Sequence, residues 1–148
     1  MGMRIKVDIS DLSKKLGVTQ QTLHRGLVEG IAEGLFEVSR RSFQEQRSPE
    51  GVPWAPLSPG YSQVKARLFP GRPILQRTRW LFRSLFREAQ GNLAIVGSNV
   101  AYAPFPQVGT SKMPARPYLP SPETAEREAQ RLGEEIVEDA IRRSEGAA

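Results

Sequence analysis

A single apolar stripe between residues 19 and 43 constrains this sequence more than any other feature. Its members follow one another at intervals of four, four, four and three residues, a spacing that places them on one face of an α-helix. They are Leu23, Leu27, Ile31, Leu35 and Val38. Thr19 stands where a capping residue would begin such a helix, and the stripe predicts that it runs to about Phe43. Any fold of this chain must therefore cover one face of a long helix.

Glycines recur every four residues within the same predicted helix, at Gly26, Gly30 and Gly34. Each glycine costs a helix about 1 kcal/mol relative to alanine. One interpretation is a mediocre helix that is held in place by packing. The other is a ridge of small residues that lets a second helix approach closely. We favour the first, because tertiary packing commonly overrides intrinsic propensity.

Two segments have the features of β-strands. Residues 3–9, MRIKVDI, alternate between apolar and polar side chains, as in a half-buried strand. Further along, Gln90-Gly91-Asn92 supplies turn residues before the apolar run 93–96, which predicts a hairpin followed by a return strand.

The chain ends in a second predicted helix. Ser121 is a suitable cap, Pro122 suits the first helical position, and Glu123 suits the first turn. Its apolar stripe is thin, which favours a place at the edge of the fold: Ala125, Ala129, Leu132, Ile136 and Ala140. The expected fold is α+β, with a long N-terminal helix and a C-terminal helix on a small antiparallel β-sheet, in a single domain spanning 1–148.

Proline-rich segments separate these elements. Residues 44–73 and 101–120 contain prolines that interrupt regular structure, yet they also contain large apolar side chains. A mere linker has no need of such side chains, so both segments are expected to be long ordered loops that pack on something.

Charge is distributed unevenly along the chain, whose formal net charge is +5. Residues 40–87 hold ten cations and two acids, whereas residues 121–148 hold eight acids and four cations. Such asymmetry fits nucleic-acid binding, and it equally fits copies that dock head-to-tail. Cysteine is absent, which excludes disulfides and thiolate metal sites. No apolar run approaches the roughly 20 residues that cross a bilayer, so no membrane partner is expected, and no signal peptide is visible.

Candidate catalytic groups are few. His24 is the only histidine and is expected to be a solvated side chain on a helix. The glycines match neither a phosphate-binding loop nor the dinucleotide fingerprint, and the acids of the last helix are better explained by charge pairing along the helix than by a cation site. The sequence therefore predicts no catalytic, metal or cofactor-binding residues and no enzyme activity.

Residues 12–25, LSKKLGVTQQTLHR, resemble a DNA-reading helix-turn-helix when taken alone. The motif needs a further helix packed across both of its helices, and only the strand-like 3–9 precedes it. Its supposed recognition helix also fails to stop, because the apolar stripe continues to Val38. A DNA-binding regulator is therefore the less favoured alternative.

Four segments occur in an informative order: SPEGVPWAPLSPGY at 48–61, ILQRTRWLFRSL at 74–85, VGSNVAYAPFPQVG at 96–109 and MPARPYLPSP at 113–122. This order resembles the phage virion morphogenesis family, the tail-completion and head–tail joining proteins of Mu-like and related tailed phages. The chain departs from the family pattern at Trp80, Pro106 and Pro120, where the family commonly has Gly, His and Gly.

The resemblance implies a structural protein of the phage neck, which completes the tail and joins it to the head as an oligomeric ring. The implied partners are further copies, six in the expected ring, and the neck, connector and tail-tube proteins, with DNA passing through the ring without being read. The implied location is the virion, assembled in the bacterial cytoplasm. A tail-terminator or head-closure ring at an adjacent neck station is the alternative.

Within this resemblance, 44–73 and 101–120 become docking loops. The candidate interface residues combine large amphipathic rings, a planar guanidinium and backbone-shaping residues: Trp54, Leu57, Tyr61, Tyr102, Gln107, Gly109, Arg116, Pro117 and Tyr118. The alternative role for such residues is to close the protomer's own core beneath its loops. For Trp54 and Tyr102 this role and the interface role are equally favoured. For Arg116 the interface role is favoured, because arginine is mostly exposed unless it is paired.

Overall fold

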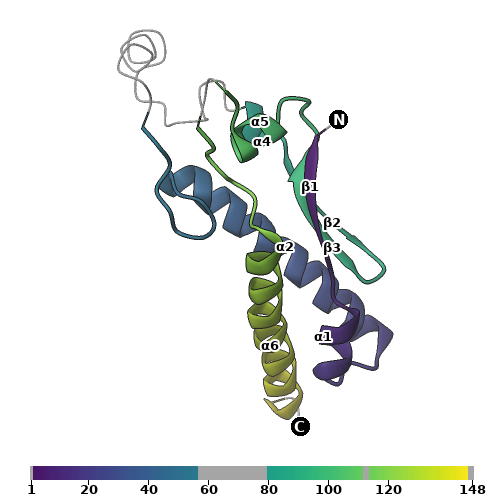
Figure 1. Ribbon diagram of the computed structural model, residues 1–148. Helices are drawn as coiled ribbons and strands as arrows, with labels where there is room; N and C mark the ends of the chain where they lie inside the picture. The colour runs from purple at the N-terminus through teal and green to yellow at the C-terminus, as the bar shows by residue number, and fades with distance from the viewer. Residues whose placement is uncertain (1, 57–79, 112–113, 147–148) are drawn as a thin grey trace.

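The computed structural model describes residues 2–56, 80–111 and 114–146 (Figure 1). Its elements, in chain order, are β1 (Met3–Asp8), α1 (Ser10–Lys15), α2 (Gln21–Glu45), α4 (Trp80–Arg83), β2 (Leu85–Gln90), β3 (Leu93–Ser98), α5 (Pro104–Val108) and α6 (Pro122–Gly146). The predicted α+β fold, with a long N-terminal helix and a C-terminal helix on a small antiparallel sheet, is confirmed.

The sheet has three strands in the order β1-β3-β2, all antiparallel. The register sets Ile5 opposite Val96, and Val96 opposite Arg87. The predicted strand at 3–9 is β1, and the predicted hairpin is β2–β3. Gly91 opens the hairpin turn with a φ of 56°, a conformation that side-chain-bearing residues rarely adopt. The return strand continues to Ser98, two residues beyond its expected end.

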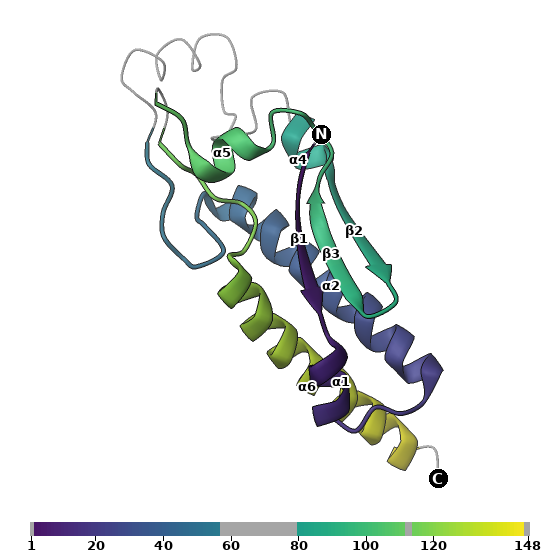
Figure 2. The same ribbon diagram turned by 45° about the vertical axis from the view of Figure 1, so that its right-hand side comes forward.

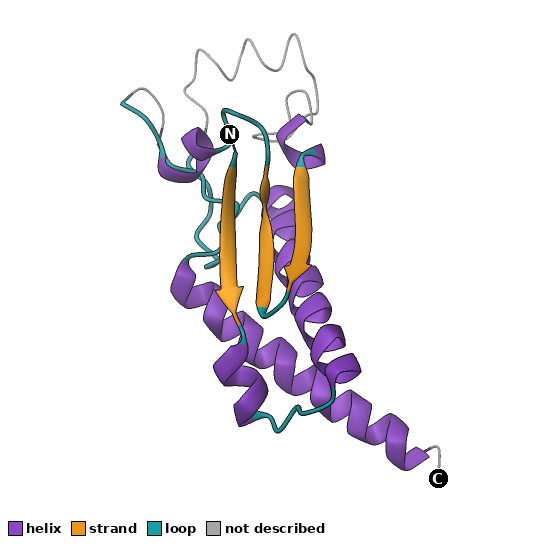
Figure 3. Ribbon diagram, turned by 90° about the vertical axis from the view of Figure 1, so that its right-hand side faces the viewer, coloured by secondary structure: helices purple, strands orange, loops and turns teal. Residues whose placement is uncertain are grey.

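Helix α2 crosses one face of the sheet and packs on β2 and β3 (Figure 3). Its apolar stripe supplies the centre of the core, where Leu27, Ile31 and Leu35 are fully buried. Helix α6 crosses α2 and lies beside β1. β1 and β2 are the two outer strands, and α6 begins on the β1 side of the sheet, opposite β2, before it runs past the end of the sheet (Figure 2).

The glycines of α2 provide the contact with α6. A Cβ added to Gly30 would lie 2.6 Å from Ile136 Cδ1, and one added to Gly34 would lie 2.8 Å from Leu132 Cδ2. These distances are shorter than real side chains allow, so the small-residue ridge is the correct interpretation at both positions. The interpretation favoured from the sequence, a mediocre helix held in place by packing, is wrong at these two positions. It holds only at Gly26, where an added Cβ would meet nothing within 4 Å.

The ends of the helices agree with the sequence only in part. The C-terminal helix begins as predicted, because Ser121 Oγ accepts a hydrogen bond from Thr124 N at 3.2 Å and Pro122 is its first residue. Thr19 was the wrong cap for α2, which starts after Gln20 with no side-chain cap. The carboxylate of Asp8 accepts hydrogen bonds from Ser10 Oγ and from Ser10 N at the start of α1, and these bonds, the first more than the second, lower the pKa of Asp8.

Only one of the two arguments against a helix-turn-helix holds in the structure. Helix α2 does continue for 25 residues across the sheet, far beyond a short recognition helix. The missing third helix, however, is supplied by α6. A Cβ on its Gly133 would lie 3.1 Å from Leu12 and 3.2 Å from Leu16 of the α1 segment.

Candidate functional site

The proline-rich loops meet at the C-terminal end of α2, around the buried ring of Phe43. Its ring centroid lies 5.6 Å from that of Trp54, 5.6 Å from that of Phe82 and 5.4 Å from that of Tyr118. Such edge-on and tilted aromatic pairs add about 0.5–1.5 kcal/mol each to the burial of their surface. The ring of Phe43 is therefore the point at which three parts of the chain meet: the loop after α2, helix α4 and the segment between α5 and α6.

Trp54 joins the loop after α2 to the segment before α6. Its ring is buried, and Nε1 donates a hydrogen bond to Pro117 O at 2.8 Å. The loop itself folds back tightly, since Ser48 Oγ accepts a hydrogen bond from Val52 N at 3.1 Å and Trp54 N donates to Gln46 O at 2.8 Å. Residues 46–54 are thus fixed at both of their ends.

Arg116 makes a second link between the same two segments. Only 4% of the residue is exposed; Nε donates to Ala55 O at 2.9 Å and an Nη donates to Pro56 O at 3.1 Å. Burial lowers the pKa of its guanidinium, although an arginine stays charged at neutral pH. Within the described part of the chain its charge meets carbonyl dipoles and no carboxylate.

Tyr118 and Gln107 join α5 to the same segment. The Tyr118 hydroxyl is fully buried and donates to Ala103 O at 2.7 Å, and burial raises its pKa. The Gln107 side chain accepts hydrogen bonds from Tyr118 N and Leu119 N at 3.0 and 2.9 Å, and donates to Leu119 O at 2.9 Å. One glutamine thus satisfies three backbone groups, as a neighbouring strand would.

We call the contacts of Phe43, Trp54, Gln107, Arg116 and Tyr118 the loop clamp. Three side chains expected at an interface, Trp54, Arg116 and Tyr118, are buried in it and bonded to the protomer's own backbone. These side chains therefore close the protomer's own core beneath its loops, which is the role that the sequence made less favoured for Arg116. Sequence reasoning also missed Phe43, which looked like the mere end of a helical stripe.

The remaining candidate residues have varied positions. Pro117 contributes its carbonyl to the clamp, and Gly109 ends α5 with a φ of 78°. Tyr102 is 41% exposed, so an interface role for its ring stays a prediction. Leu57 and Tyr61 lie outside the described residues.

A comparison with known protein families matches residues 7–144 to the phage virion morphogenesis family. The chain belongs to the phage virion morphogenesis family. It is also 30% identical over 122 residues to "Mu-like prophage FluMu G protein 1" of Haemophilus influenzae, a match that covers 80% of this chain and 84% of that protein. No solved structure matches. The resemblance drawn from the four sequence segments is thereby confirmed.

Exposed apolar side chains occur on the segments that the clamp joins in this phage virion morphogenesis protein. Three exposed side chains lie on or next to α5, namely Tyr102, Phe105 and Val108, which are 41%, 54% and 65% exposed. Val52, in the loop that the clamp fixes, is 63% exposed. The clamp therefore presents large apolar side chains to solvent on a backbone that it holds in place.

The structure also revises the account of His24. Its Nδ1 lies 3.1 Å from the hydroxyl of the buried Ser13, so the side chain is half-buried and hydrogen-bonded between α1 and α2 rather than solvated. In residues 2–56, 80–111 and 114–146, no three His, Cys, Asp or Glu side chains gather as metal ligands would. None of the helices in those ranges has the length and apolarity needed to span a membrane.

Proposed function

We propose that this chain is a structural protein of the virion neck, which completes the tail and joins it to the head as a ring of copies, six in number. The family match over residues 7–144 carries the proposal, and the Mu-like prophage relative agrees with it. Membership of a virion morphogenesis family points to a structural, non-enzymatic role. DNA would pass through the ring without being read.

The loop clamp supports this proposal physically. A docking surface loses less conformational entropy on binding when its backbone is already ordered. The clamp orders the loops at 46–56 and 114–119 through side-chain hydrogen bonds, including Trp54 to Pro117 and Arg116 to Ala55. Exposed Phe105 and Val108 then supply apolar contact area for a neck or tail partner.

Inactivation of the gene in its phage, with complementation from a plasmid, tests the proposal. We expect lysates without the protein to contain filled heads and separate tails of normal length, as seen by electron microscopy, and the complemented lysate to contain joined particles. We also expect the chain in purified particles by mass spectrometry. Joined, infectious particles in its absence would refute the proposal.

The same micrographs separate the two alternative stations. Loss of a tail terminator is expected to give tails of irregular length, because nothing then stops the growing tube. Loss of a head-closure ring is expected to give heads that have released their DNA. Separate full heads with regular tails favour tail completion.

A further inference from the structure

A second aromatic cluster adjoins the loop clamp at Phe82 and lies where α2 meets α4 and the outer strand β2. The guanidinium of Arg87 stands 5.0 Å from the ring centroid of Phe36, and that of Arg40 stands 6.0 Å from the same centroid. Arg40 also lies 6.0 Å from the ring centroid of Phe82. We call these four residues the arginine–phenylalanine cluster.

The charges of this cluster are largely uncompensated. Arg40 forms one exposed ion pair with Glu37, at 3.0 Å, and exposed pairs contribute little energy. Arg87 forms no ion pair with any residue that the structure describes. Cation–π contact with the phenylalanine rings favours these positions of the guanidiniums and leaves those N–H groups that face solvent able to bind a carboxylate, apart from the Arg40 Nη1 that pairs with Glu37.

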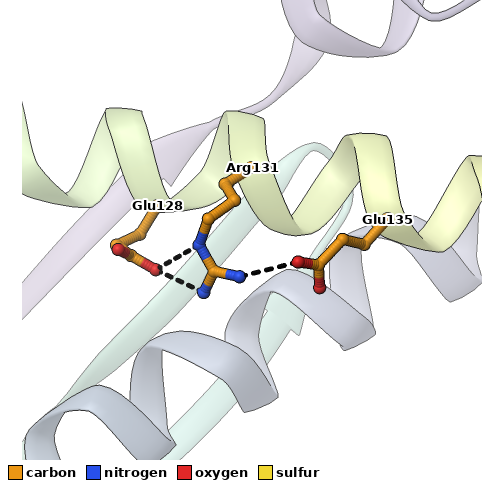
Figure 4. A network of polar contacts seen from close by, with 3 residues as sticks. All are labelled: Glu128, Arg131 and Glu135. Atoms are coloured by element: carbon orange, nitrogen blue, oxygen red, sulfur yellow. Dashed lines mark hydrogen bonds and ion pairs between the residues drawn. The ribbon is translucent and has the colours of Figure 1, made fainter.

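Helix α6 presents the opposite charge at the other edge of the sheet. It contains eight acids and four arginines. Arg131 is held between Glu128 and Glu135, at 2.7 and 2.8 Å (Figure 4), while Arg142 and Arg143 pair with Glu138 and Asp139. These ion pairs involve three of the four arginines of α6, and the fourth, Arg127, donates a hydrogen bond to Thr124 Oγ1 at 3.2 Å.

Four acids of α6 form no ion pair within the described ranges, namely Glu123, Glu126, Glu134 and Glu145, and the two that lie away from the ends of the helix are Glu126 and Glu134. Both are exposed, and neither forms an ion pair within the described ranges. They lie on one stripe of the helix with Gln130 between them, spaced by two intervals of four residues. Eight residues of helix span about 12 Å.

We propose that the arginine–phenylalanine cluster binds the Glu126–Glu134 stripe of a second copy of this chain. The Cζ atoms of Arg40 and Arg87 lie at most about 11 Å apart, the sum of their distances to the Phe36 centroid. Two carboxylates about 12 Å apart along a helix are on flexible side chains, which can converge on guanidiniums within that upper limit. This inference deepens the proposed function and rests on it, because it identifies the contact that would build the ring.

The positions of the two surfaces explain why a ring would form. The cluster lies at the β2 edge and α6 lies at the β1 edge, so one copy has both surfaces and cannot join them to each other (Figure 2). Contact between two different surfaces of identical chains is heterologous and adds copies in one direction until a rotation closes it.

The absence of cysteine from the chain allows a direct test. Ala89→Cys places a thiol on exposed β2, two residues beyond Arg87, and Gln130→Cys places one between the two acids. Neither change removes a charge. We expect particles that carry the doubly substituted chain, treated with a short bismaleimide, to give a ladder of covalent multimers on a denaturing gel. The matched control joins Ala89→Cys to Thr22→Cys, an exposed and uncharged position in the first turn of α2, and is expected to give no ladder.

Charge reversal then tests the chemistry of the contact. Arg87→Glu should reduce the ladder about tenfold or more, as expected for losing a close charge pair, and Glu134→Arg in the same chain should restore it. Arg25→Glu makes the same change of charge on an exposed part of α2 and should leave the ladder intact.

The outcomes are separable. If the chain is missing from particles, the proposed function fails. If the chain is present but gives no ladder, or if Gln130→Cys alone gives dimers, this inference fails while the proposed function stands. A ladder unaffected by Arg87→Glu refutes the charge pairing. Loss of duplex-DNA binding on Arg87→Glu, without any ladder, would assign the cluster to nucleic acid and overturn the inference.

Discussion

Arg116 carries a charge that the fold has removed from water and surrounded with carbonyl groups. Arg116→Ala leaves Ala55 O and Pro56 O without their donors, and hydrogen bonds to charged groups contribute about 1.5–3 kcal/mol each in favourable cases. We expect the free energy of unfolding to fall by about 2–4 kcal/mol in urea denaturation. An exposed arginine at an interface, the role that the sequence favours for Arg116, would instead leave the stability of the isolated chain nearly unchanged. Arg41→Ala, at an exposed arginine of α2, is the control and should cost less than about 0.5 kcal/mol.

Ser39 offers the opposite case, a buried hydroxyl that makes no hydrogen bond with any residue described by the structure. Ser39→Ala removes a desolvated polar group and introduces the best helix former, so the free energy of unfolding should rise by about 1 kcal/mol. Ser42 is the matched control in the same helix, because its Oγ donates to Val38 O at 3.2 Å. Ser42→Ala should raise stability less than Ser39→Ala in the same urea titration. Equal gains would show that helix propensity alone is responsible.

Tyr118 makes the stability of the fold depend on pH in alkaline solution. Burial raises the pKa of its hydroxyl above the ordinary value of 10.0, so the folded state retains a proton that the unfolded state releases. The contribution of the Tyr118 hydroxyl to the free energy of unfolding is therefore complete below pH 10.0, and it is lost as the pH rises above that value. We expect Tyr118→Phe to cost about 1 kcal/mol at neutral pH, through loss of the bond to Ala103 O, and this difference to shrink above about pH 10. A constant difference across a series of urea titrations would contradict the assignment.

The sequence identified most clamp residues as important but did not indicate the contacts that they make within the chain. Trp54 and Pro117 are 63 residues apart, and nothing in either segment indicates that an indole donates to that carbonyl. Arginine is usually exposed, so the buried position of Arg116 contradicts the ordinary expectation for its residue type. Long-range pairing of polar groups is decided by the three-dimensional path of the chain, which local patterns do not contain.

At the scale of elements, apolar periodicity predicted β1, α2, the hairpin and α6, because each has one face that must be buried. Helix ends were less accurate. Thr19 looked like a cap by residue type alone, whereas α2 begins two residues later. Helix propensity could not decide the role of the glycines in α2 either, because Gly30 and Gly34 leave room for the side chains of Ile136 and Leu132 in α6.

Those glycines give a matched prediction. Gly26→Ala should raise the free energy of unfolding by about 1 kcal/mol, because the helix gains propensity and the new methyl group meets nothing. Gly34→Ala gains the same propensity but forces Leu132 to move, since an added Cβ would lie 3.1 Å from Leu132 Cγ. We expect this variant to be no more stable than the original protein, and less stable than Gly26→Ala by about 1 kcal/mol or more. Thermal melts of the two variants provide the comparison, and equal melting temperatures would refute a close contact of α2 and α6.

At the scale of the whole molecule, the fold is closed by its first strand. β1 pairs with β3, and Val7 and Ile9 enter the core. Deletion of residues 2–9 should abolish cooperative unfolding, as seen by near-ultraviolet circular dichroism, because it exposes the central strand and opens the core. Deletion of residues 142–148 removes only exposed residues of α6 and the end of the chain, and should leave the melting temperature nearly unchanged. A cooperative transition in the first variant would show that β1 is dispensable.

The pairing of β1 with β3 also has a consequence for synthesis on the ribosome. Asp8 pairs with Leu93 and Met3 with Ser98, so the first strand is made long before its partner. At about 5–20 residues per second, translation of the intervening 85 or more residues takes roughly 4–17 seconds or longer. During that time an apolar strand has no partner on its own chain. Arg4, Lys6 and Asp8, which alternate with its apolar residues, are charges of the kind that discourages nascent strands from aggregating.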